Sequence, residues 1–148
     1  MSAHHTPFGI LITSFLDADW SEMPFGLRQT TLHLGSEDQP DQPILVMTRF
    51  PPDVDLPRHS HAAPFCDAVV EGSMWVEDDG QWYPRGTVRM VPAGTTYGPT
   101  RSGAEGLTLL EFYANAAGFP AAMDIDAMTE DQRAEISRWR AGQATNAS

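Results

Sequence analysis

The pair His59-Ser60-His61 is the part of the sequence best suited to chemistry. In a β-strand, side chains at positions i and i+2 point to the same face, so the two imidazoles would aim at one point. Two convergent imidazoles are the beginning of a divalent-metal site, although three protein ligands are the norm for a catalytic metal. The pair therefore predicts a metal site that needs a further ligand. The alternative is two histidines on a solvated strand edge.

Short apolar or alternating runs between glycine and proline turns are expected to position the histidines. They cover residues 29–34, 43–50, 67–72, 73–78, 87–92 and 107–113. Short strands at this spacing are typical of an all-β sandwich or barrel. Asp79-Gly80 predicts a hairpin turn between the strands that carry Trp75 and Trp82. The residues expected in the core are Met47, Trp75, Val88, Met90 and Phe112.

A helical pattern replaces the strands towards the C-terminus. Thr129 and Gln132 have the spacing of a capping box, in which each side chain binds the backbone of the other residue. Gly142 is expected to end the helix. The sequence therefore predicts one C-terminal helix from about Glu130 to Ala141.

Composition excludes several classes of function. The chain has 148 residues and a formal net charge of −11, which argues against binding to nucleic acid or to anionic membranes. None of its 9 basic residues is a lysine, so Schiff-base chemistry is excluded. The single cysteine, Cys66, excludes an intrachain disulfide, and the apolar run 8–16 is too short to span a bilayer. We expect a soluble cytoplasmic protein.

The spacing around the histidines resembles that of the cupin superfamily, which are small jelly-roll barrels with two sequence motifs. The first motif runs Gly, five residues, His-x-His, three or four residues, Glu, six residues, Gly; the second runs Gly, five residues, Pro-x-Gly, two residues, His. The matching residues are His59, His61 and Gly72 in the first motif and Gly86, Pro92 and Gly94 in the second. The resemblance covers about residues 44–113. It implies a cupin-type double-stranded β-helix with an N-terminal arm (1–22), a barrel (23–115) and a C-terminal helix and tail (116–148), all in one domain.

Two of the four metal ligands usual in cupins are replaced in this sequence. Phe65 stands where the family has Glu, and Tyr97 stands where it has the last His. Asp67 is our first choice for the third ligand, because it shares the strand face of Phe65 and would complete a two-His-one-carboxylate set. It can also be an ordinary strand-edge residue. The further candidates, in order, are His33, Glu111 and Cys66.

Three other residues are candidates for catalysis or substrate binding. Tyr97 binds metal poorly because a phenol titrates near 10, but it can hydrogen-bond a substrate. Glu111 either faces solvent or lies in an apolar pocket, where desolvation would raise its pKa and suit it to acid–base work. Arg89 is either a surface residue or the cation that orients an anionic substrate.

Three functions are compatible with these residues. In the first, a divalent metal on His59, His61 and Asp67 supports dioxygenase-like chemistry on a small organic molecule, with Fe(II) ahead of Zn, Mn or Ni. In the second, a metal-free cupin acts as an isomerase or epimerase, with His59 as base, Tyr97 as acid and an arginine that holds an anionic group. In the third, the barrel binds a small molecule without catalysis.

A homodimer is the assembly we expect from the resemblance and from the N-terminal arm. Small cupins usually pair through barrel faces and N-terminal strands. The apolar run "FGILITSFL" (8–16) would be exposed on a lone barrel, and a two-fold interface would bury it.

Overall fold

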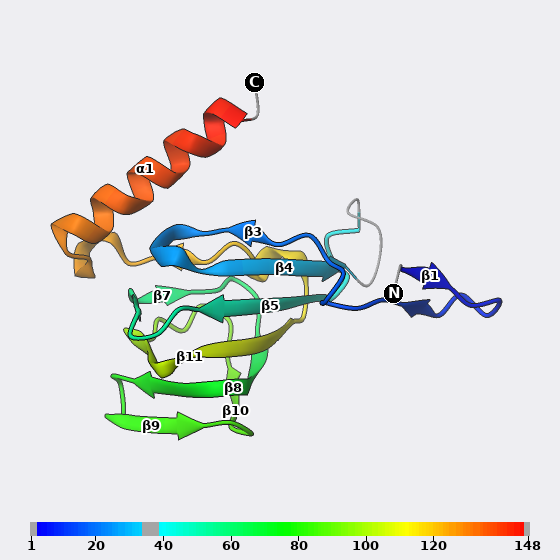
Figure 1. The fold of residues 1–148 in the computed structure, drawn as a ribbon, viewed down its shortest axis with the longest axis horizontal. Helices are drawn as coiled ribbons and strands as arrows, with labels where there is room; N and C mark the ends of the chain where they lie inside the picture. Colours follow the sequence, from blue (N-terminus) through cyan, green and yellow to red (C-terminus); the bar gives the residue numbers. More distant parts are fainter. Residues whose placement is uncertain (1–2, 34–38, 147–148) are drawn as a thin grey trace.

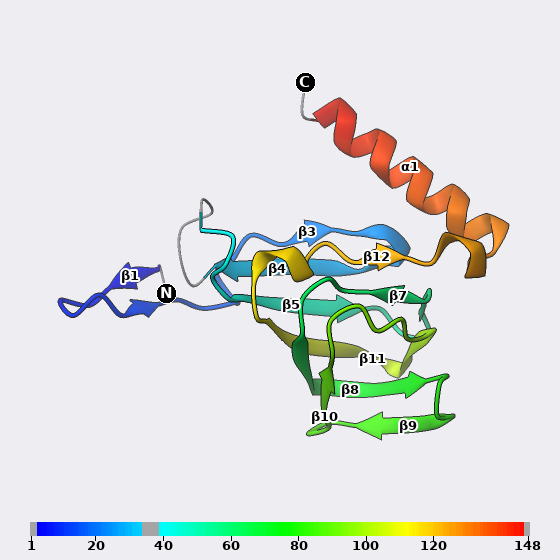
Figure 2. The same ribbon diagram turned by 180° about the vertical axis from the view of Figure 1, so that it is seen from behind.

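The computed structural model describes residues 3–33 and 39–146, whose strands form an antiparallel jelly-roll barrel (Figures 1 and 2). The main sheet has the order β10-β8-β11-β5-β4-β3, with β6 on β11 and β9 on β8. Its strands are β3 (Ser21–Glu22), β4 (Arg28–His33), β5 (Ile44–Phe50), β6 (Asp55–Leu56), β8 (Phe65–Val76), β9 (Gln81–Pro84), β10 (Val88–Val91) and β11 (Thr100–Tyr113). The last residue of the predicted strand 29–34 lies outside the described residues.

Smaller elements cover one side of this sheet and extend from it. A two-stranded sheet of β7 (His59–Ser60) and β12 (Ala122–Met123) lies over the inner face in Figure 2. The arm carries the hairpin of β1 (His4–His5) and β2 (Leu11–Ile12), which extends away from the barrel. Three 3₁₀ turns and a helix complete the fold: η1 (Pro24–Gly26), η2 (Ala116–Gly118), η3 (Ile125–Ala127) and α1 (Glu130–Asn146). Within the described residues, no helix has the length and apolar character needed to cross a membrane.

The strand alternation builds the barrel interior. Buried and half-buried residues alternate along β5 and along the first half of β8, as expected for strands with one face towards a core. One cluster of buried side chains consists of Leu27, Phe50, Val69, Met74, Val76, Leu107 and Leu109, and another of Ile44, Val46, Phe65 and Tyr113. Full burial of such an apolar side chain contributes roughly 1.5–3 kcal/mol. These contacts hold the walls of the site in place.

The predicted runs 67–72 and 73–78 form one strand, β8, that continues through Gly72. Gly72 has a φ of +73°, and a β-carbon there would lie 2.0 Å from the carbonyl oxygen of Gly106 on β11. The β8–β11 register shifts at this place, between Ser102 and Leu107. The close approach of the two backbones, rather than a turn, explains the glycine.

We expect Gly72→Ala to lower the free energy of unfolding by about 2–3 kcal/mol, because the new methyl group meets a backbone oxygen at a positive φ. Gly86→Ala is the matched control, since Gly86 also has a positive φ (+94°) but nothing within 4 Å of its β-carbon position. It should cost about 1 kcal/mol. Urea unfolding of both variants measures the difference, and equal costs would contradict the steric explanation.

The structure confirms the helix start and corrects its end. Gln132 N–H donates to Thr129 Oγ1 at 3.2 Å, and Thr129 N–H donates to Gln132 Oε1 at 3.0 Å, so the capping box is present. The helix does not end at Gly142 but continues to Asn146. A glycine inside a helix lowers the stability of the helix by about 1 kcal/mol relative to alanine, and this loss is too small to end the helix at Gly142.

The hairpin prediction is confirmed, whereas part of the predicted core is wrong. Trp75 pairs with Trp82 across β8 and β9, and their ring centroids lie 5.6 Å apart. Val88, Met90 and Phe112 are exposed, with Met90 at 84 %, while Met47 and Trp75 are half-buried. The reason is strand parity: the neighbours of Met90 and Phe112 point into the barrel, so these apolar side chains point out of it.

Candidate functional site

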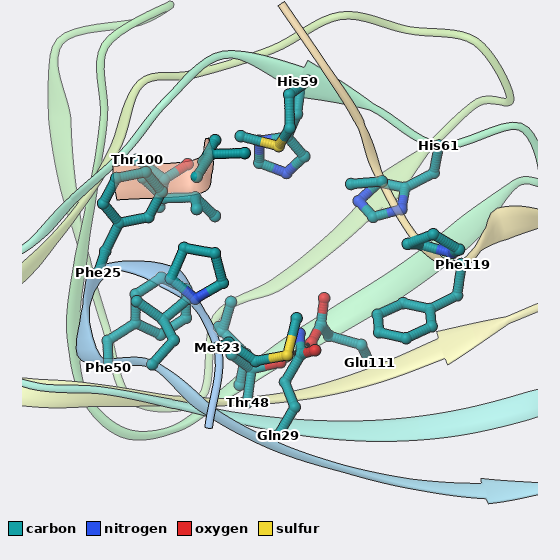
Figure 3. Close-up of a pocket in the computed structure, with 18 of the residues that line it drawn as sticks. Met23, Phe25, Gln29, Thr48, Phe50, His59, His61, Thr100, Glu111 and Phe119 are labelled. Carbon is teal, nitrogen blue, oxygen red and sulfur yellow. Dashed lines mark hydrogen bonds between the residues drawn. The ribbon is translucent and has the colours of Figure 1, made fainter. Parts of the chain in front are cut away.

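A cavity of about 260 Å³ lies inside the barrel, between the inner face of the sheet and the first turns of α1. Its apolar lining comes from Met23, Pro24, Phe25, Leu27, Phe50, Leu56, Leu109, Phe119, Pro120, Ala121, Met123, Ile136 and Trp139. Its polar lining comes from Gln29, Thr48, His59, His61, Arg89, Tyr97, Thr100, Glu111, Tyr113 and Arg140 (Figure 3). An apolar cavity with a few convergent polar groups is the usual form of a small-molecule site.

The C-terminal helix closes one side of this cavity. Ile136 and Trp139 of α1 contribute to the lining. Glu135 Oε1 accepts from the backbone N–H of Phe25 at 2.5 Å, and Trp139 Nε1 donates to the carbonyl of Glu22 at 3.0 Å. The helix is therefore tied to the segment that enters β4, a docking that no sequence pattern indicated.

His59 is held at both ring nitrogens. Its Nδ1 lies 2.8 Å from the carbonyl oxygen of Pro57, which can only accept, so Nδ1 carries the proton. Its Nε2 then accepts from the hydroxyl of Tyr97 at 2.8 Å. Backbone hydrogen bonds in both directions also join His59 to Tyr97. Burial lowers the pKa of His59 to about 4, so the ring is neutral at physiological pH.

His61 is also held by a backbone carbonyl at Nδ1, but its Nε2 has a longer contact than that of His59. Its Nδ1 donates to the carbonyl of Gly118 at 2.6 Å, and its Nε2 lies 3.5 Å from the hydroxyl of Tyr113. Burial lowers its pKa as well. The rings of His59 and His61 have centroids 5.3 Å apart, and both line the cavity, as the i, i+2 spacing predicted.

Asp67 shares the inward strand face of Phe65, but its carboxylate binds Arg89. The guanidinium donates through Nε at 3.1 Å and Nη2 at 2.5 Å to the two oxygens. Asp67 and Arg89 are also direct partners in the β8–β10 register. Arg89 lines the cavity with its guanidinium 5.0 Å from the centre of the Tyr97 ring, so the surface alternative for Arg89 is wrong.

Glu111 points into the barrel, as one of its two predicted alternatives required. Its Oε2 accepts from Thr48 Oγ1 at 2.5 Å, and its Oε1 accepts from the hydroxyl of Tyr113 at 2.8 Å. Thr48 in turn accepts from Gln29 Nε2 at 3.0 Å. Burial raises the pKa of Glu111 to about 7, although the hydrogen bond from Thr48 opposes the shift. The carboxyl therefore changes its charge near neutral pH.

Of the remaining candidates, Tyr97 belongs to this centre and two others lie apart from it. Tyr97 lines the cavity, and burial raises the pKa of its phenol, which stays protonated at neutral pH. His33 is half-buried at the end of β4 and does not line the cavity. Cys66 has the opposite strand parity to Asp67 and is also absent from the lining.

The donor set does not fit a metal centre with three protein ligands. Both histidines hold Nδ1 on a backbone carbonyl, which is common for metal-binding imidazoles. Among residues 3–33 and 39–146, however, no three His, Cys, Asp or Glu side chains lie close enough together to hold a metal ion. The structure does not bring Asp67 into such a group, because Arg89 takes both of its carboxylate oxygens.

Sequence reasoning missed two residues of the hydrogen-bond chain that leads to Glu111. Gln29 and Thr48 are direct partners in the β4–β5 register, and both point inward. Their strands had been expected, but nothing in the alternation of "QTTLHL" or "PILVMTRF" says which parity faces the interior. Tyr113 had a visible signal, since it lies two residues after Glu111 on the same strand face.

Comparisons with solved structures identify the fold. The polyketide cyclase RemF from Streptomyces resistomycificus has a TM-score of 0.62 at 18% identity, over 82% of this chain and 88% of that chain. A mutant of Bacillus subtilis oxalate decarboxylase OxdC has a TM-score of 0.59 at 16% identity, over 76% of this chain and 31% of that chain. A chain in the complex of Rhodobacter sphaeroides SigE with the anti-sigma ChrR has a TM-score of 0.53 at 19% identity, over 68% and 50%. Identities this low show the fold alone.

A family comparison covers most of the barrel. The family model of the ChrR cupin-like domain matches residues 10–116, which is more than half of the chain and includes both histidines. No curated protein matches the chain significantly. The match, the jelly-roll topology and the inward-facing histidine pair agree with one another. The chain belongs to the family of ChrR cupin-like domains, within the cupin superfamily.

Proposed function

We propose that this cupin is an acid–base enzyme that moves a proton on a small, largely apolar organic molecule without a metal. The observation that carries the proposal is the buried Glu111, whose pKa near 7 is that of an efficient general base at neutral pH. The cavity of about 260 Å³ is slightly smaller than most ligand pockets, which span roughly 300–1,000 Å³. It therefore suits a compact substrate.

The proposed reaction is an isomerisation that begins at a carbon next to a carbonyl group. The carboxylate of Glu111 takes a proton from this carbon, and the electron pair of the C–H bond moves onto the carbonyl oxygen. Arg89 and the protonated Tyr97 line the wall where we place that oxygen, and a cation there would stabilise its negative charge. The substrate of this class carries a carbon–carbon double bond next to that carbon, so the negative charge also reaches the far carbon of the double bond. The protonated Glu111 returns the proton there and the double bond shifts towards the carbonyl group, so no oxidant or reductant is consumed.

The comparisons support this class of reaction at the level of the fold. RemF, which shares the jelly roll, is a polyketide cyclase. The position of Tyr113 also supports the proposed reaction. Its hydroxyl donates to Glu111 and lies 3.5 Å from Nε2 of His61. His61 is neutral and can accept a proton there, so the base has an internal partner for proton exchange.

Deuterium exchange tests the proposal. Protein that has been dialysed against a chelator should catalyse exchange of the α-hydrogens of cyclic ketones and β-diketones that it binds, as followed by NMR. The rate should rise with pH through about 7, as the Glu111 carboxyl ionises, and level off above it. Ligands that bind without any exchange would contradict catalysis and favour the non-catalytic binding module.

A divalent metal on His59 and His61 is the second candidate, because both Nδ1 atoms are held by backbone carbonyls as in metal-binding histidines. This alternative requires near-stoichiometric metal in protein purified without a histidine tag, with loss of the metal in a His59→Ala, His61→Ala double variant. It also requires that chelation abolish exchange. Fe(II) would then support the dioxygenase-like chemistry expected from the sequence, with Zn, Mn and Ni as the other metals.

We also propose that two copies of the chain pair through the outer sheet face. This face consists of Leu45, Met47, Cys66, Ala68, Val88, Met90, Leu110 and Phe112, which lie side by side in the register of four strands. None of them is charged, so the contact would bury no like charges against one another. The arm adds a second apolar surface, with Phe8 91 % and Leu16 85 % exposed, and extends away from its own barrel.

The dimer predicts a specific disruption. The full chain should sediment as a dimer at micromolar concentration, and Met90→Asp should sediment as a monomer because it places a charge in the outer sheet face. Ile125→Asp is the control, since Ile125 is 54 % exposed but lies in η3, outside this face. Deletion of residues 1–19 should weaken the dimer. A wild-type monomer, or a dimer that survives Met90→Asp, contradicts the proposal.

A further inference from the structure

Two residues of the cavity wall each carry a buried polar atom that has no hydrogen-bond partner. Among the described residues, Gln29 Oε1 and Thr100 Oγ1 are the buried side-chain oxygens or nitrogens without one. Both residues belong to the cavity wall, and Thr100 is only 1 % exposed. Buried polar groups are nearly always satisfied in native proteins, so an unsatisfied one requires an explanation. Their shared position on the wall suggests that a ligand supplies the missing bonds.

The chemistry of the two atoms restricts what can bind them. The amide nitrogen of Gln29 already donates to Thr48, so its free oxygen needs a donor such as a hydroxyl group. The Thr100 hydroxyl can donate or accept. It lies with Phe25 and Leu56 in an apolar part of the wall, where a charged group would lose its hydration without compensation. Both positions therefore favour neutral hydroxyl groups over carboxylate or phosphate.

The two atoms lie on different walls of the cavity. Figure 3 shows Thr100 beside Phe25 and Gln29 beside Thr48, with Phe50 on the same side of the cavity as Phe25. Thr100 begins β11, whereas Gln29 belongs to β4. Aromatic residues Phe25, Phe50 and Phe119 contribute to the lining around them. A flat ring system would fill this space with good contacts.

We propose that the cavity binds an aromatic or alicyclic ring compound with hydroxyl groups at two separated positions, one held by Gln29 and the other by Thr100. The proposal names the substrate class of the acid–base site and rests on that function for its catalytic meaning. Gln29 would connect one hydroxyl group of the ligand, through Thr48, to the base Glu111. Thr100 would fix the far end of the ring system.

Binding of a matched pair of probes tests the assignment. The probes are 2,6-dihydroxynaphthalene, with hydroxyl groups at opposite ends, and naphthalene, which has the same ring body. Calorimetric titration should show at least tenfold tighter binding of the diol to the wild-type protein, because a site built for a hydroxyl group rejects the analogue that lacks it. Equal affinity, preference for naphthalene, or binding of neither probe at millimolar concentration overturns the proposal.

Thr100→Val provides the decisive variant, because valine keeps the shape and removes the unpartnered hydroxyl. We expect it to bind the diol at least tenfold more weakly, bind naphthalene as before, and unfold at the same temperature as the wild type or a higher one. Thr108→Val is the control on the same strand: its hydroxyl donates to Glu71 at 3.0 Å, away from the cavity, so diol binding should not change.

The outcomes separate this proposal from the proposed function. If Thr100→Val binds the diol like the wild type, an ordered water satisfies Thr100 and the ligand assignment is wrong, whatever the exchange assay shows. If the diol preference depends on Thr100 but no bound ketone exchanges its protons, the ligand class is right and the catalytic function fails. The unfolding temperature guards against a folding defect, since a misfolded variant would lose naphthalene binding too.

Discussion

Glu111→Gln should lower the exchange rate by roughly 10²–10⁴, the contribution that a positioned general base makes to proton transfer. Glutamine keeps the size of the side chain and can still bond Thr48 and Tyr113, but it cannot take up a proton. Glu105→Gln is the matched control, because Glu105 lies on the same strand, β11, and is exposed. Exchange that survives in Glu111→Gln and not in a histidine variant would move the base to His59 or His61.

The same variant should change the pH dependence of stability. The pKa of Glu111 is raised in the folded protein from 4.5 to about 7, so folding favours the protonated carboxyl. Stability from this group is fully present below about pH 4.5 and falls as the pH rises to about 7. Glu111→Gln removes the loss and should gain on the order of 2–3 kcal/mol over the wild type by about pH 8.

The comparison of the two proteins isolates Glu111 from the histidines. The lowered pKa of His59, about 4, gives a slope of opposite sign, because between about pH 6.5 and about pH 4 the unfolded chain binds a proton at this imidazole and the folded protein does not. That slope is present in both proteins and cancels in the difference. Urea unfolding at several pH values measures the difference directly. A constant gap between wild type and Glu111→Gln from about pH 5 to about pH 8 would contradict the raised pKa.

Asp67→Ala is the second large effect, with an expected loss of about 3–5 kcal/mol of unfolding free energy. The Asp67 side chain is 1 % exposed and Arg89 17 %, so truncation leaves a guanidinium inside the barrel without its carboxylate. The exposed pair Arg101–Asp55 provides the control, with side chains 48 % and 44 % exposed. Asp55→Ala should cost less than about 1 kcal/mol, because water screens such a pair.

A double variant separates pairing from packing. Asp67→Leu with Arg89→Met replaces the ion pair by apolar side chains and should recover most of the stability, because neither charge is left buried. Its catalysis should not recover, since the cation beside Tyr97 is gone. If Asp67→Ala costs no more than Asp55→Ala, the pair is too well hydrated to hold the wall of the cavity.

Strand parity grouped residues on common strand faces but left open which face points inward and which strands are neighbours. The i, i+2 rule placed Asp67 with Phe65 and Glu111 with Tyr113 on common faces, and the structure agrees. The rule says nothing about which strands are neighbours, and Arg89 reaches Asp67 because β10 lies beside β8. Sequence reasoning therefore supplied Asp67 as a candidate anion on the strand face of Phe65, but not the cation that it binds.

The elements with local signals were predicted best. The hairpin turn and the capping box need only a few adjacent residues, and both are present. The docking of α1 depends on Glu135 and Trp139 meeting a segment more than a hundred residues earlier, which no local pattern records. The exposed Val88 and Met90 were misplaced for a related reason: an apolar side chain indicates burial, whether by its own barrel or by a partner.

During synthesis on the ribosome, the cavity can close only after α1 has emerged and docked. The hydrogen bonds of α1 join Phe25 to Glu135 and Glu22 to Trp139, at separations of 110 and 117 residues. Closure of so long a loop comes late, after the local strand pairs have formed. When the barrel strands have left the ribosome but residues 130–140 have not, the apolar cavity lacks the helix that closes one side. Chaperones that hold apolar surfaces would therefore meet this protein mainly before residues 130–140 have left the ribosome.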